Sequence, residues 1–129
     1  MKFATSSVVA LLLAVPGIQA CGVTESTEQR CYSAQRGETP QNIDRDELNY
    51  IIGDLNRRGA EIWTQTNCAE WTVMRLSGTQ ALTRKFKEGN REITKSDIAK
   101  SLEWIRDNCG TDGGAMVADN GILVKLTRV

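Results

Sequence analysis

The chain contains no histidine among its 129 residues. This absence excludes nucleophiles that an imidazole activates, as in Ser-His-Asp and Cys-His sites, and it excludes metal sites with histidine ligands. A zinc site made of cysteines alone needs closely spaced pairs, but the four cysteines lie far apart along the sequence. Neither a phosphate-binding glycine loop nor an N-glycosylation signal is present. We therefore expect no metal and no cofactor.

An excess of charge of either sign is also lacking. Lysine and arginine together number 16, as do aspartate and glutamate, so the formal net charge at pH 7 is +0. Nucleic-acid binding depends on an excess of basic residues, because the ligand is a polyanion. We therefore expect no nucleic-acid partner.

Long apolar runs are absent except near the N-terminus, where one extends over residues 8–15. It is too short to cross a bilayer, which takes about 20 residues. The small residue Ala20 precedes Cys21, as at a signal-peptidase cleavage site. The sequence thus predicts a signal peptide over residues 1–20 and a single secreted, extracellular domain over residues 21–129. Two alternatives stay open, a membrane anchor and a lipoprotein signal in which Cys21 is acylated.

Two segments carry the same signals for the start of a helix. Asp44 stands three residues before Glu47, as in a capping box, and apolar residues flank this unit as a hydrophobic staple. Thr94 begins a second such unit, in which aspartate is the poorer box partner. An apolar stripe follows each start and stops near a glycine. The sequence predicts helices over residues 44–58 and 94–108.

The four cysteines follow the predicted cleavage site and predict two disulfides formed in an oxidising compartment. Four cysteines allow three pairings. We favour Cys21 with Cys109 and Cys31 with Cys68, which requires the end of the second helix to meet the start of the mature chain. Acylation of Cys21 would instead leave one of the other three as a free thiol.

The segments between and after the helices favour strands. Residues 61–76 are rich in β-branched and aromatic side chains, and a Ser-Gly-Thr turn leads from them into residues 80–87, so a β-hairpin is predicted. The alternation of apolar residues in the first strand is imperfect, which indicates a bulge or burial on both sides. Asn120-Gly121 is a hairpin turn signal. Further strands are expected over residues 29–35, 115–117 and 122–129.

This order of elements predicts the fold class. Strand, helix, hairpin, helix and strand is the order of a split βαβ pair, in which both helices cover one face of an antiparallel sheet. The predicted architecture is a disulfide-stapled α+β sandwich of the ferredoxin-like type.

Few residues are candidates for a binding site. Trp104 falls off the apolar stripe of its helix, so it is either an exposed anchor for a partner or a core residue. Arg84, Lys85 and Lys87 end the first hairpin, where they either contact an acidic surface or protect an exposed edge strand from aggregation. We take these four residues as the candidate partner-binding site.

Several short motifs carry a family resemblance. The predicted mature chain starts with Cys21-Gly22, and its second helix ends at Cys109-Gly110, followed by Gly113-Gly114-Ala115-Met116 and Leu123-Val124-Lys125-Leu126. With the two helices and the intervening hairpin, this resembles the fungal necrosis-inducing-factor effector domain and the killer toxins with their fungal homologues. The resemblance implies a small secreted, disulfide-bonded α/β sandwich that is not an enzyme and disturbs host or competitor cells. The toxins carry more cysteines than this chain.

Three functions follow from these observations. The leading hypothesis is a secreted, non-enzymatic, effector-like or toxin-like protein that binds a surface on host or competitor cells. The second is a small secreted hydrolase that uses a pair of carboxylates, for which Glu61, Glu70 and Asp112 are candidates. The third is an inhibitor or a carbohydrate-binding module that uses Trp104 or the hairpin tips.

Overall fold

The computed structural model of the chain describes Cys21 and residues 26–129, so the predicted signal peptide over residues 1–20 lies outside the described residues. Neither helix in this described part combines the length and the apolar character that a membrane span requires. In chain order the elements are β1 (Arg30–Cys31), the 3₁₀ turn η2 (Ala34–Arg36), α1 (Arg45–Arg57), β2 (Ile62–Gln65), β3 (Trp71–Arg75), β4 (Thr79–Lys85), β5 (Arg91–Thr94), α2 (Lys95–Cys109), β6 (Gly114–Val117), the 3₁₀ turn η3 (Asp119–Gly121) and β7 (Ile122–Arg128).

Both helices begin where the capping signals predict. The side chains of Asp44 and Thr94 each accept a hydrogen bond from the backbone N–H three residues later, over 3.0 and 3.2 Å. Glu47 has a different role from that of a capping-box partner. Its carboxylate accepts from the Ser77 hydroxyl at 2.7 Å and from the Gly78 N–H at 3.1 Å. The start of α1 is therefore tied to the turn between β3 and β4.

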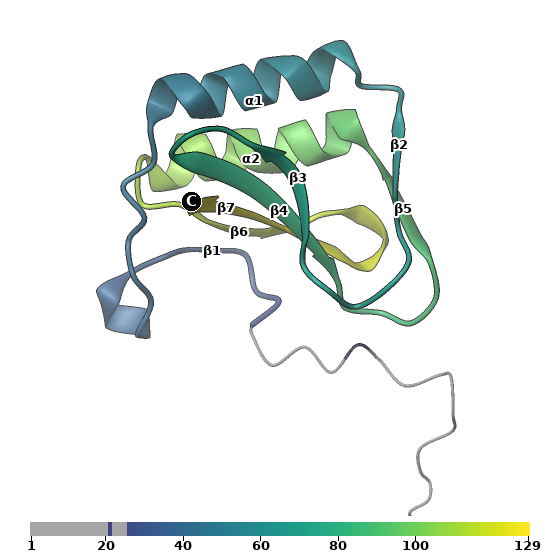
Figure 1. The fold of residues 1–129 in the computed structure, drawn as a ribbon. Helices are drawn as coiled ribbons and strands as arrows, with labels where there is room; N and C mark the ends of the chain where they lie inside the picture. Colours follow the sequence, from purple (N-terminus) through teal and green to yellow (C-terminus); the bar gives the residue numbers. More distant parts are fainter. Residues whose placement is uncertain (1–20, 22–25) are drawn as a thin grey trace, which may run out of the picture.

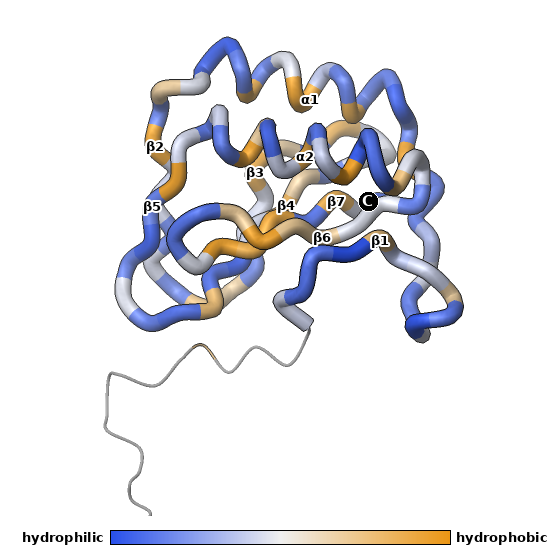
Figure 2. The backbone as a smooth tube through the Cα atoms, turned by 180° about the vertical axis from the view of Figure 1, so that it is seen from behind, coloured by the Kyte–Doolittle hydropathy of each residue, from blue (hydrophilic) through white to orange (hydrophobic). Residues whose placement is uncertain are grey.

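Five strands form one antiparallel sheet in the order β1-β6-β7-β4-β3, and β2 pairs with β5 in a separate ribbon. The register places Ala81, Val124 and Leu126 on one face, where they pack against the apolar stripes of α1 and α2. Opposite views in Figures 1 and 2 show both helices on this side of the sheet. We call this the inner face. The outer face is the other one, which carries Arg84 and Lys125.

The α+β class and the antiparallel sheet are confirmed, but the ferredoxin-like order is not. A split βαβ arrangement places the first strand inside the sheet. Here β1 lies at an edge beside β6, and β7 takes the interior position next to β4. The reason is strand length, because β1 has 2 residues whereas β7 has 7 and pairs with β4 along its whole length.

The two predicted hairpins, β3–β4 and β6–β7, are confirmed. Asn120 and Gly121 have φ values of 63° and 73°, the left-handed conformation that their turn signal indicates. The irregularity expected in the first hairpin is a shift of register between Thr72 and Met74. Local turn chemistry therefore specified both hairpins.

The single strand predicted over residues 61–76 is wrong, because a turn divides it into β2 and β3. The side-chain oxygen of Asn67 accepts from the backbone N–H of Ala69 at 2.9 Å, which is an Asx turn. The chain changes direction there, and β2 pairs with β5 in place of β4.

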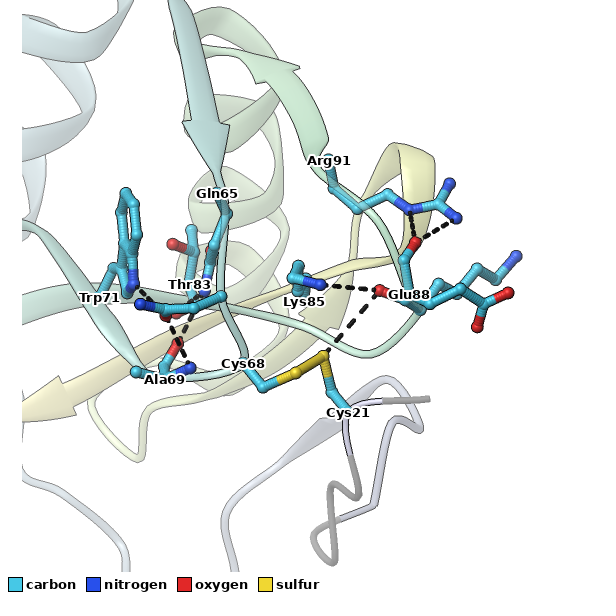
Figure 3. The surroundings of a disulfide bond; sticks show 11 residues. Cys21, Gln65, Cys68, Ala69, Trp71, Thr83, Lys85, Glu88 and Arg91 are labelled. Carbon is cyan, nitrogen blue, oxygen red and sulfur yellow. Dashed lines mark hydrogen bonds between the residues drawn. A yellow bond between two sulfur atoms is a disulfide. The ribbon is translucent and has the colours of Figure 1, made fainter. Parts of the chain in front are cut away.

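All four cysteines are paired, Cys21 with Cys68 and Cys31 with Cys109. Two disulfides are thus confirmed, but the favoured pairing is wrong. The end of α2 lies over β1, whose Cys31 faces inward opposite Gly114. A Cβ atom on Gly114 would lie 3.2 Å from the Cys109 sulfur and 2.4 Å from the Arg30 carbonyl oxygen. Glycine at this position therefore allows β1 and the disulfide to pack closely against β6. Cys21 is joined to the β2–β3 loop (Figure 3).

The Cys31–Cys109 bond should contribute more to stability than the Cys21–Cys68 bond. Replacing Cys31 and Cys109 with alanine should lower the free energy of unfolding by about 4 kcal/mol, because the bond restricts a long loop in the unfolded chain. The loop spans 78 residues, against 47 for the other bond, and Cys109 also belongs to the core. Urea unfolding of the two double variants measures the difference. A larger loss in the Cys21/Cys68 variant would contradict this ranking.

Candidate functional site

Lys85 does not lie on an exposed edge, as the candidate partner-binding site requires. It is 4% exposed, because β4 is an interior strand and the residue faces inward opposite Ile122. Its ammonium group donates to the Lys87 carbonyl at 3.3 Å, beside the Cys21 sulfur, which lies 3.9 Å from the same oxygen (Figure 3). The expectation of an exposed Lys85 is therefore wrong.

The other two hairpin cations are separated from Lys85. Arg84 is half-buried and points to the outer face beside Leu123, since side chains alternate along a strand. Lys87 is exposed beyond the end of β4 and lies against Gly121. The three cations thus form no continuous basic edge.

Trp104 lies on α2, on the other side of the sheet from Arg84. It is half-buried and packs against the core cluster. This placement is intermediate between the core and the exposed interpretations, and it separates Trp104 from the cations of the hairpin. The four candidate residues do not meet in one site.

A shallow hollow of about 340 Å³ opens on the outer face, near the β1 edge of the sheet. Arg30 and Lys125 lie in one row of this face, because both pair with Ala115 of β6, Arg30 from β1 and Lys125 from β7. Its volume is within the range of small-ligand sites. The hollow is lined by Arg30, Tyr32, Glu38, Thr39, Gln41, Lys125 and Thr127.

Arg30 is the most firmly held side chain of the hollow. Its side chain is 5% exposed and donates to the Glu38 carboxylate at 2.5 Å. It also donates to the backbone carbonyls of Ser26 and Glu28 at 2.9 and 3.0 Å, and its guanidinium lies 5.5 Å from the ring centre of Tyr32. A buried guanidinium with this many partners is held in one position.

The second cation of the hollow is also compensated. Lys125 donates to Glu70 at 2.5 Å, so each positive charge of the lining has a carboxylate beside it. Gln41 fixes one wall, because its side-chain oxygen accepts from the Arg128 N–H at 3.0 Å. The result is a polar but nearly neutral surface with hydrogen-bonding groups held in place. Such a surface suits an uncharged ligand with hydroxyl or amide groups.

The three carboxylates considered for hydrolysis have separate partners. Glu61 accepts from Lys95 at 2.7 Å, and this hydrogen bond lowers the pKa of Glu61, whereas a general acid needs a raised pKa. Glu70 pairs with Lys125, and Asp112 lies in an exposed loop. In the described residues, no group of three or more acidic or cysteine side chains could hold a metal ion.

The hollow was not predicted from the sequence. Arg30 and Glu38 flank a short 3₁₀ turn, and Lys125 comes from the last strand. Charged residues at such positions are common on any protein surface, so neither their spacing nor the composition distinguishes these residues from others. The alternation of apolar Val124 and Leu126 with polar Lys125 and Thr127 in the last strand was a signal that part of one face of that strand is polar. Comparison of the chain with protein-family models, curated proteins and solved structures finds no match.

Replacing Trp104 with alanine tests its placement. The free energy of unfolding should fall by about 2 to 3 kcal/mol, since a fully buried tryptophan costs more and an exposed one almost nothing. Tyr50, which is 57% exposed on α1, is the matched aromatic control and should lose less than about 0.5 kcal/mol on replacement with alanine. If denaturant unfolding shows that both variants lose equally little free energy of unfolding, Trp104 is an exposed residue and remains a candidate for partner binding.

Proposed function

We propose that this protein is a secreted, non-enzymatic effector-like or killer-toxin-like protein that binds a surface component of host or competitor cells. The observation that carries the proposal is the outer-face hollow, in which a buried Arg30 and its partners hold polar groups in fixed positions. Fixed groups reduce the entropy that binding costs. The two disulfides support an extracellular location, because such bonds persist in oxidising compartments.

The chemistry of the hollow supports binding over catalysis. Its two ion pairs leave little net charge. Outside the hollow, the pKa of Glu61 is lowered, opposite to the requirement of a carboxylate acid. The carbohydrate-binding alternative shares this site, because threonine and glutamine side chains can both donate to and accept from sugar hydroxyls, and carboxylates can accept from them. A cell-surface polysaccharide is thus one ligand that the hollow fits.

A substitution that fills the hollow tests the proposal. Thr39 is exposed on the lining, so its replacement with tryptophan should block the hollow without disturbing the fold. Purified oxidised protein is applied to host tissue and to competing microbes, and tissue death and growth are measured. Wild-type protein should cause a response, and T39W should reduce it at least tenfold. T66W, the same change on an exposed residue of the β2–β3 loop, is the matched control and should remain active.

Three carboxylate variants separate binding from hydrolysis. E61Q, E70Q and D112N should each keep most of the activity, with E70Q the most affected because Glu70 pairs with Lys125. Activity that survives T39W but disappears in E61Q or D112N would favour the hydrolase. The absence of a response to wild-type protein in both tissue and microbes would contradict an effector-like or toxin-like role.

A further inference from the structure

In the part of the chain that the structure describes, only half of the β6 edge of the five-stranded sheet is paired. β1 pairs with β6 through two positions, Arg30 with Ala115 and Cys31 with Gly114. The pairing stops there because the chain before Arg30 turns away from β6. The carbonyls of Ser26 and Glu28 both accept from the Arg30 guanidinium, which lies on the outer face. Among the described residues, no strand pairs with β6 beyond Ala115 on this side.

The hydrogen-bond pattern shows which backbone groups face this edge. The Ala118 N–H donates to the Ile122 carbonyl within the hairpin, and the Tyr32 N–H donates to the Gly113 carbonyl across to the β1 side. In an antiparallel strand, successive residues direct their N–H and C=O groups to opposite sides. Ala118 and Met116 therefore face β7, and Gly113, Ala115 and Val117 face the β1 side. Both backbone groups of Val117 thus point to the edge with which no described strand pairs.

A hollow of about 310 Å³ runs beside this edge, between β6 and the first half of α2. Its floor is apolar, because Met116 and Ala118 pack against the core. Its rim is polar, with Asp97 and Lys100 on the helix and Asp119 in the turn. The side chain of Val117 is 36% exposed, which is high for a large apolar residue in a strand.

We propose that this edge binds an extended peptide segment of another protein, which adds a strand to β6 in line with β1. An added strand pairs its backbone with the N–H and C=O of Val117, and its alternate side chains enter the space between strand and helix. The apolar floor fits a medium-sized apolar side chain. The rim carries two carboxylates and one ammonium group, so charge complementarity favours a basic residue next to it.

This surface is independent of the outer-face hollow. The hollow beside β6 lies on the inner face, between Met116 and α2, whereas Thr39 and Lys125 line the hollow of the outer face. The peptide site therefore stands or falls separately from the proposed function, and variants of one surface should not affect the other.

The test compares two substitutions of Val117. Random heptapeptides displayed on phage are selected on the intact oxidised protein, and enriched peptides are synthesised and titrated calorimetrically. V117P removes the N–H that faces the edge and leaves the β6–β7 hydrogen bonds intact, because proline is compatible with an edge strand. V117A keeps the N–H and serves as the matched control. V117P should weaken binding at least tenfold, and V117A should change it less than about threefold.

Methylated peptides give a second test that needs no change in the protein. N-methylation of the peptide residue that pairs with Val117 should abolish binding, whereas N-methylation of the next residue, whose N–H faces away, should not. The proposal is overturned if no peptide is enriched, if V117P binds as well as wild-type protein, or if both methylated peptides bind equally. It is also overturned if sedimentation shows a V117P-sensitive dimer without peptide binding, since a second copy would then be the occupant.

Discussion

The Cys31–Cys109 disulfide is the constraint on which both surfaces of this protein depend. It fixes β1, a strand of 2 residues, to the end of a helix of 15 residues. Because side chains alternate along a strand, anchoring Cys31 on the inner face directs Arg30 to the outer face. There Arg30 donates hydrogen bonds to Glu38 and to the carbonyls of Ser26 and Glu28. These bonds form one wall of the polar hollow, and they direct the chain before β1 away from β6.

The second disulfide fastens the other end of the same N-terminal segment. Cys21 is joined to Cys68 in the β2–β3 loop, and Cys31 is joined to Cys109 at the end of α2. A strand of two residues has few ladder hydrogen bonds and could not hold this segment alone. Covalent attachment replaces the packing that a small domain cannot supply. A fixed buried arginine in the hollow is a consequence of this attachment.

Local signals in the sequence predicted the parts of the fold that depend on neighbouring residues. The caps at Asp44 and Thr94 and the turn at Asn120-Gly121 are of this kind, since each acts within a few residues. Strand order, disulfide pairing and the burial of Lys85 depend on contacts between distant segments, and these were mispredicted. The hollow belongs to the same class, because its lining comes from β1, the loop after η2 and the last strand. No local pattern brings those segments together.

Disulfide mapping tests this account most directly. Purified oxidised protein is digested without reduction, and the linked peptides are identified by mass spectrometry. The structure predicts one peptide pair that joins Cys31 to Cys109 and one that joins Cys21 to Cys68. A peptide that joins Cys21 to Cys109 would contradict the account, because β1 would then have no anchor on α2 and Arg30 would have no fixed place in the hollow.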